Sequence, residues 1–124
     1  MRVLIADDSV YKRIAIRNAL QEFCSVQTEM ASDMETALEM AGSHSYDLLI
    51  TDMDYPPVRG ARSVWNSGEI LIRRLREAGN PVPVIICSSE NYSNDLAAAC
   101  VWYHENGILS WDLKSAMKKA GLIR

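Results

Sequence analysis

Four polar side chains of this chain stand directly after short apolar runs, where the strands of a sheet would end. They are Asp7, Asp8, Asp52 and Ser88. Carboxylates gathered in a small volume repel one another, and Mg²⁺, which prefers oxygen ligands, relieves that repulsion. A carboxylate beside such a cation can attack a phosphoryl group, while a hydroxyl such as that of Ser88 stabilises the phosphoryl charge. These residues therefore indicate a candidate Mg²⁺ site capable of phosphoryl chemistry.

A parallel sheet is the element that would bring these side chains together. Apolar runs alternate about five times with segments of helical period, which is typical of βαβ units. Ligands of such sheets bind outside the carboxyl ends of the strands. The sequence therefore predicts an α/β fold with the acidic groups and the hydroxyl at one edge of the sheet.

The bounds of the elements follow from the spacing of apolar residues and from capping and turn residues. Strands are predicted at 2–6, 26–31, 46–51, 84–87 and 101–104, and helices at 9–23, at 33–41, from 68, at 95–100 and from 110. The strand at 26–31 alternates polar and apolar residues, so it is predicted to be an edge strand. The first helix is expected to bury an apolar stripe formed by Val10, Ile14, Ala15 and Leu20.

Size and composition exclude several classes of protein. The 124 residues predict one domain, spanning 1–124. A net charge of -3 argues against a general surface for nucleic acid. The three cysteines lack metal-ligand spacing and are expected to be free thiols. No apolar run has the length of a signal peptide core or a membrane span, so a cytoplasmic protein without a membrane partner is expected.

The order of these residues resembles the receiver domain of two-component response regulators over nearly the whole chain. The family's acidic pair is matched by Asp7 and Asp8, and its phosphoacceptor aspartate by Asp52. Its proline four residues later is matched by Pro56, and its hydroxyl at the end of strand four by Ser88. The resemblance implies a flavodoxin-like doubly wound (βα)5 fold with five parallel strands in the order 2-1-3-4-5.

The resemblance also implies a function in a phosphorelay. Asp52 would accept a phosphoryl group from a sensor histidine kinase or a phosphotransfer protein. Mg²⁺ would be held by Asp7, Asp8, Asp52 and the backbone carbonyl of Asp54, and Ser88 would hydrogen-bond the phosphoryl group. The change would pass to a downstream protein or a homodimer through the fourth helix, strand five and the last helix. Such a domain is a signalling switch and not a turnover enzyme.

The family's lysine at the end of strand five is missing from this chain. Depending on the register, His104, Glu105 or Asn106 takes its place. Lys12 lies four residues after Asp8, on the same face of the predicted helix, so its side chain could reach the site and substitute. The alternative is an ordinary solvated lysine.

The third helix is predicted to begin only near residue 68, so the segment 59–67 is interpreted as an insertion of about eight residues beside the site. Its Arg59, Arg62 and Trp65 either cover the site and contact the phosphoryl group or belong to a surface loop with one docked tryptophan.

Further residues match family positions that tune or transmit the signal. Asp54 and Glu90 stand two residues after the phosphoacceptor and the hydroxyl, where they would affect loss of the phosphoryl group. The signalling aromatic of strand five would be Trp102 or Tyr103.

Two other functions are compatible with the sequence. A degenerate receiver would act as a phosphorylation-independent interaction module, because the strand-five lysine is absent. A haloacid-dehalogenase-like phosphatase shares the spacing of Asp52 and Asp54, although its motifs come in a different chain order.

Overall fold

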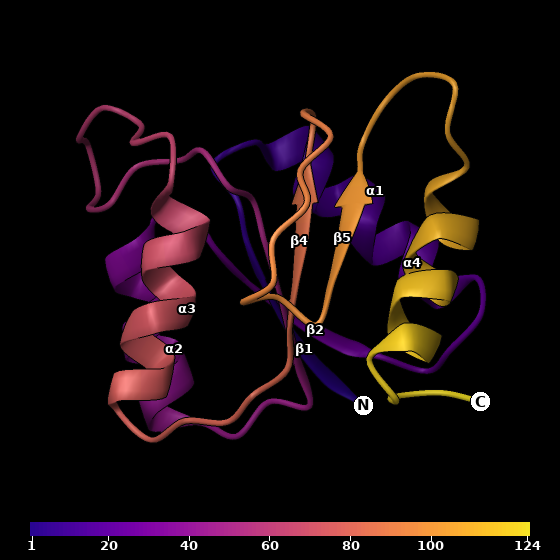
Figure 1. The fold of residues 1–124 in the computed structure, drawn as a ribbon, viewed down its shortest axis with the longest axis horizontal. Helices are drawn as coiled ribbons and strands as arrows, with labels where there is room; N and C mark the ends of the chain where they lie inside the picture. Colours follow the sequence, from indigo (N-terminus) through magenta and orange to yellow (C-terminus); the bar gives the residue numbers. More distant parts are fainter.

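Five parallel strands form the centre of the molecule, which a computed structural model describes over residues 1–124 (Figure 1). The strands are β1 (Arg2–Ala6), β2 (Gln27–Ala31), β3 (Leu48–Thr51), β4 (Val84–Ser88) and β5 (Ala99–Trp102). The helices are α1 (Val10–Gln21), α2 (Met34–Ser43), α3 (Ser67–Glu77) and α4 (Leu109–Lys119). The strand order is β2-β1-β3-β4-β5, so the predicted topology and the position of β2 at an edge are confirmed.

The helices cover the two faces of the sheet in pairs (Figure 1). One apolar cluster joins the sheet to α2 and α3, and a second joins it to α1 and α4. The central strands β1, β3 and β4 are almost entirely buried, which explains their continuous apolar sequences. No helix is long and apolar enough to cross a membrane.

The carboxyl ends of β1, β3 and β4 lie next to one another at one edge of the sheet. Ala6 pairs with Thr51, so the residues after these two strands are neighbours. Thr51 pairs with Ile86, and β4 therefore extends two residues further to Ser88. The polar groups therefore lie at the carboxyl edge of the sheet, as the sequence predicts.

The helix predicted at 95–100 is wrong. Residues 89–98 form turns and extended chain, and β5 begins at Ala99, two residues before the predicted strand. The Asn94 side chain accepts a hydrogen bond from the Leu96 backbone N–H at 2.9 Å, and such local bonds compete with helix formation. Pairing of Ala99 and Cys100 with β4 then removes the residues that would have continued a helix. The fold therefore has four helices and not five.

The predicted buried stripe of α1 is wrong in part. Val10 is 54% exposed and Ile14 is 37% exposed, whereas Leu20 is buried as predicted. The other buried positions of this helix are Lys12, Ile16 and Ala19. The helix is rotated about its axis so that Lys12 points inward, toward the carboxylates at the carboxyl edge of the sheet.

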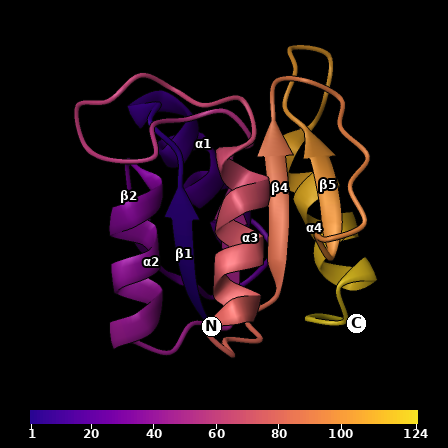
Figure 2. The same cartoon turned by 60° about the vertical axis from the view of Figure 1, so that its left-hand side comes forward.

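The segment between β3 and α3 arches beside the carboxyl edge, on the side of α2 and α3 (Figure 2). Its carbonyls at Pro56 and Pro57 accept the N–H groups of Met34 and Glu35 at 3.0 and 2.9 Å. They satisfy donors that the first turn of α2 leaves free. This contact fixes the direction in which the chain leaves β3.

Candidate functional site

The acidic pair after β1 is divided between the interior and the surface. Asp7 is 1% exposed, and Asp8 is exposed. Asp7 Oδ1 accepts the Ser9 backbone N–H at 2.9 Å, and its backbone carbonyl accepts a hydrogen bond from Arg13 at 2.6 Å. Asp7 is therefore fixed by the turn that begins α1.

Asp52 follows β3 and lies at the centre of the carboxyl edge. Its backbone N–H donates to the Ala6 carbonyl at 2.9 Å, which continues the sheet pairing by one residue. Its Oδ1 accepts the Met53 backbone N–H at 2.8 Å, whereas no hydrogen bond engages Oδ2. The side chain is 14% exposed, so it is held by the protein and still reachable from solvent.

Lys12 supplies a cation to this site from α1. Its Nζ lies 2.8 Å from Asp7 Oδ2 and 3.2 Å from Asp52 Oδ1. It also donates a hydrogen bond to the Cys87 carbonyl at 2.5 Å. The lysine side chain is only 8% exposed, which excludes the alternative of an ordinary solvated lysine.

Burial and the neighbouring charges shift the pKa values of Lys12 and Asp52. Burial alone lowers the pKa of the Lys12 ammonium, but the Asp7 and Asp52 carboxylates outweigh it, and the pKa lies above its usual value. Burial raises the pKa of the Asp52 carboxyl, and the attraction of Lys12 offsets this only in part. Burial is therefore the larger of the two effects, and the Asp52 carboxylate is more basic than that of an exposed aspartate.

Asp7, Asp8 and Asp52 each place one carboxylate oxygen within 4.8 Å of the others. Asp7 Oδ2 is buried and accepts no well-aligned hydrogen bond, although Lys12 lies in ion-pair distance of it. The three carboxylates form the all-oxygen donor set that a hard divalent cation such as Mg²⁺ prefers. They fit the cation that the sequence predicts, and the Lys12 ammonium, 2.8 Å from Asp7 Oδ2, neutralises part of their charge.

Ser88 shares a pocket of about 300 Å³ with Asp52. Ser88 is 3% exposed, and its hydroxyl accepts the Glu90 backbone N–H at 3.2 Å. Asp54 and Glu90 also line this pocket, as the sequence predicts for residues near the phosphoryl position. The remaining lining residues are Ser63, Ser89 and Tyr92.

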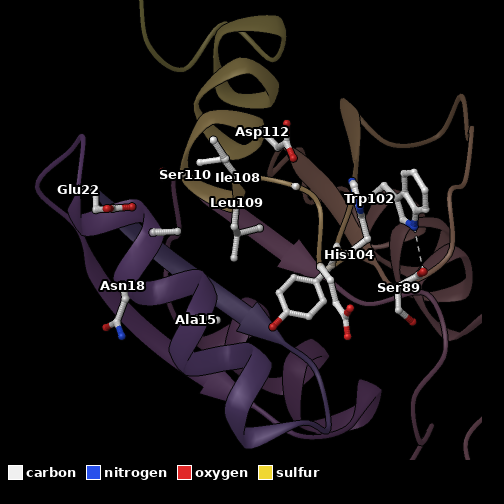
Figure 3. Close-up of a pocket in the computed structure, with 14 residues that line it drawn as sticks. Ala15, Asn18, Glu22, Ser89, Trp102, His104, Ile108, Leu109, Ser110 and Asp112 are labelled. Carbon is white, nitrogen blue, oxygen red and sulfur yellow. Dashed lines mark hydrogen bonds between the residues drawn. The ribbon is translucent and has the colours of Figure 1, made fainter.

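The end of β5 does not present His104 to the site, and none of the three residues predicted to replace the lysine does so. His104 stacks on Trp102 with ring centroids 3.8 Å apart, and the Trp102 indole N–H donates to the Ser89 carbonyl at 3.0 Å (Figure 3). Tyr103 lies on the opposite face of the strand, with the Lys12 ammonium 5.6 Å from its ring centroid. Of the residues considered for the place of the missing lysine, Lys12 is the one whose ammonium lies beside Asp52.

The loop at 59–67 lies on the surface and contributes no arginine to the site. Arg59 and Arg62 are exposed, and Trp65 is 65% exposed, so the expected docked tryptophan is wrong. A bridge between Tyr55 and Val64 closes the loop at its base. The loop instead contributes Ser63 to the wall of the pocket.

Sequence reasoning missed Arg13, Ser63 and Tyr92. Arg13 holds the backbone beside the acidic pair, and the other two contribute hydroxyl groups to the pocket. Burial and the charges of Glu90, Asp54 and Asp52 raise the pKa of the Tyr92 phenol. No local spacing identifies these residues, because Arg13 contacts a backbone carbonyl from within α1 and the other two lie in loops.

Residues 3–116 match the response regulator receiver domain family, and the chain belongs to that family. The acidic pocket is the place where this family binds Mg²⁺. The chain is 38% identical over 92 residues to the chemotaxis protein CheY of Pseudomonas aeruginosa, covering 73% of this chain and 68% of that protein.

Solved structures agree with this assignment. The response regulator TrrA of Thermotoga maritima, determined in complex with Mg²⁺ and beryllofluoride, has a TM-score of 0.76 at 25% identity, covering 96% of this chain and 97% of that one. RcsB of Salmonella enterica, bound to promoter DNA, has a TM-score of 0.77 at 22% identity, covering 98% of this chain and 61% of that one. The second match supports the fold alone. Neither the degenerate receiver nor the haloacid-dehalogenase-like phosphatase is favoured by these matches.

Proposed function

We propose that this chain is a working receiver in which Asp52 accepts a phosphoryl group in the presence of Mg²⁺. The observation that carries the proposal is the Lys12 ammonium between Asp7 and Asp52, at 2.8 and 3.2 Å. A buried cation at this place supports a working switch over a degenerate module, because the phosphoryl charge has a cationic partner. The donor is the phosphohistidine of a sensor kinase or of a phosphotransfer protein.

In the transfer, an Asp52 carboxylate oxygen forms a bond to phosphorus while the P–N bond of the phosphohistidine breaks and the imidazole nitrogen keeps the electron pair. Oδ2 is the oxygen free to attack, because Oδ1 is held by the Met53 N–H and by Lys12. Lys12 and the Ser88 hydroxyl then stabilise the charge on the phosphoryl oxygens.

Mg²⁺ is proposed to be held by Asp7, Asp8, Asp52 and the backbone carbonyl of Asp54, and when bound it neutralises the charge of the transferred group. Asp54 and Glu90 border the same pocket and are proposed to tune the lifetime of the phosphoryl group. The product is a phosphorylated protein that signals to a downstream partner, so we propose a switch and not a turnover enzyme.

The proposal is tested by adding acetyl phosphate and Mg²⁺ and measuring the intact mass of the protein. Asp52→Asn is expected to abolish the gain of one phosphoryl group. Glu39→Gln, at an exposed acid of α2 that does not line the pocket, is the control and should retain it. A wild-type chain that gains no phosphoryl group, and binds no beryllofluoride in the presence of Mg²⁺, would contradict the proposal.

A further inference from the structure

The ammonium that pairs with Asp52 belongs to α1, so the phosphoryl state of Asp52 acts directly on that helix. Lys12 contacts three other parts of the molecule besides Asp52: Asp7 after β1, the Cys87 carbonyl in β4, and the ring of Tyr103 after β5. A phosphoryl dianion on Asp52 would attract this ammonium more strongly than a single carboxylate does. Any displacement of Lys12 would alter its contact with Tyr103.

Tyr103 lines a groove of about 720 Å³ between α1 and the segment that enters α4. On one side α1 presents Ala15, Asn18 and Glu22, and on the other lie Ile108 and Leu109. Ile108 is 49% exposed although it is a large apolar residue. We call this feature the α1–α4 groove, and its remaining lining residues include Ala19, Ser89, Trp102, His104, Glu105, Gly107, Ser110 and Asp112.

The charged residues that line the α1–α4 groove are all acidic. Glu22, Glu105 and Asp112 line it, and no lysine or arginine does. An apolar floor with an acidic rim complements a segment that is apolar on one face and basic at its edges. The residues from α1 stand at the spacing i, i+3, i+4 and i+7, which is one face of a helix, and the open groove beside that face has room for a second helix.

We propose that the α1–α4 groove is the surface through which the state of Asp52 is read, and that it binds an amphipathic helix of a partner protein with lysine or arginine flanking its apolar stripe. This inference rests on the proposed function. It replaces the surface expected from the sequence, because the fourth helix of that surface does not exist in this fold. Lys12 and Tyr103 form the connection between the phosphoryl site and the groove.

The test uses a synthetic amphipathic helix of leucine and lysine as the probe, and the same peptide with glutamate in place of lysine as its control. Binding is measured by fluorescence anisotropy, with and without Mg²⁺ and beryllofluoride. The affinities of the loaded and the unloaded protein for the lysine peptide are expected to differ by about 5-fold or more, which is the low end of typical coupling. The glutamate peptide is expected not to bind.

Matched variants separate the groove from the rest of the surface. Glu22→Lys on the rim should weaken binding of the lysine peptide several-fold, whereas Glu39→Lys on the exposed side of α2 should not. Ile108→Ser should likewise weaken binding, whereas Val58→Ser, at a residue of similar exposure in the loop after β3, should not. Equal effects of either variant and its control would overturn the groove as the binding surface.

The connection through Tyr103 is tested by the ratio of peptide affinities in the loaded and unloaded states. Tyr103→Phe keeps the ring beside Lys12 and should keep the ratio, whereas Tyr103→Leu should reduce it to 1. Fluorine NMR of bound beryllofluoride reports the phosphoryl site independently in every variant. If wild type binds no beryllofluoride, the proposed function fails. If it binds beryllofluoride with no change in peptide affinity, or if loading makes the protein a homodimer that excludes the peptide, this inference alone is overturned.

Discussion

Replacing Lys12 by methionine tests whether the buried ammonium is what holds the acidic site together. Methionine keeps most of the aliphatic volume and removes the charge. Asp7, which is 1% exposed, would then lose its only cationic partner. Without Mg²⁺, the variant is expected to be less stable than wild type, because a buried carboxylate without a counter-charge is costly.

The distances set the magnitude of this loss. At an effective dielectric constant of about 20, unit charges 2.8 and 3.2 Å apart attract by about 6 and about 5 kcal/mol. Burying the ammonium costs several kcal/mol, which offsets part of this attraction. The expected net loss in the free energy of unfolding on removing the ammonium is about 3 kcal/mol. For a chain of 124 residues this corresponds to a decrease in Tm of about 10 °C.

The assay is thermal unfolding of wild type and variant in EDTA and in Mg²⁺. Mg²⁺ should stabilise Lys12→Met more than wild type, because the metal can then occupy the acidic cluster without opposing an ammonium. Calorimetry should accordingly show tighter Mg²⁺ binding by the variant. Lys114→Met, at an exposed lysine of α4, is the control, and its Tm should change little.

Two results would refute the reasoning. A Tm of Lys12→Met equal to that of wild type in EDTA would mean that the ion pairs contribute nothing. An equal effect of Mg²⁺ on the two proteins would mean that the ammonium and the metal do not act on the same carboxylates.

Other substitutions and conditions test the parts of the fold that support the site. A Cβ on Gly68 would collide with the backbone carbonyl of Asp52, so Gly68→Ala should cost about 1–3 kcal/mol in urea unfolding, whereas Gly42→Ala in α2, which meets nothing, should be neutral or slightly stabilising. Ser67→Ala removes the hydroxyl that donates to the Tyr55 carbonyl at 2.5 Å, and a loss of about 1–2 kcal/mol is expected by the same method. The pKa of Lys12 is higher in the folded state than the usual 10.5, so its contribution to stability should be complete below that pH and disappear as the pH rises through the folded value; the stability difference between wild type and Lys12→Met, followed by urea unfolding, should shrink only in that range.

The sheet could be predicted from the sequence because its signals are local and repeated. The buried strands are continuous apolar runs. The first two strands are followed by capping residues, Ser9 and Asp33, whose side chains accept N–H groups of α1 and α2. The position of Asp52 follows directly from this pattern. The acidic cluster was predictable for the same reason, since parallel strands share one carboxyl edge.

The missing helix could not be read from the sequence in the same way. The segment before β5 contains capping residues and then alanines, which favour either a short helix or a strand. Pairing with β4 makes the residues from Ala99 a strand, and this pairing is not encoded in the local sequence of the segment. Tyr103 follows β5 with the Lys12 ammonium 5.6 Å from its ring centroid, whereas His104 stacks on Trp102.

Lys12 shows how far the spacing of residues can identify a functional group. Its distance of four residues from Asp8 places it on the correct face of α1, but burial of the ammonium requires the Cys87 carbonyl of β4 as an acceptor, which no spacing within α1 reveals. With the cation on α1, an aromatic ring stands beside the ammonium at the end of β5. In the function proposed above, Lys12 supplies the charge that a strand-five lysine would have supplied, so α1 is expected to be the element that responds to phosphorylation.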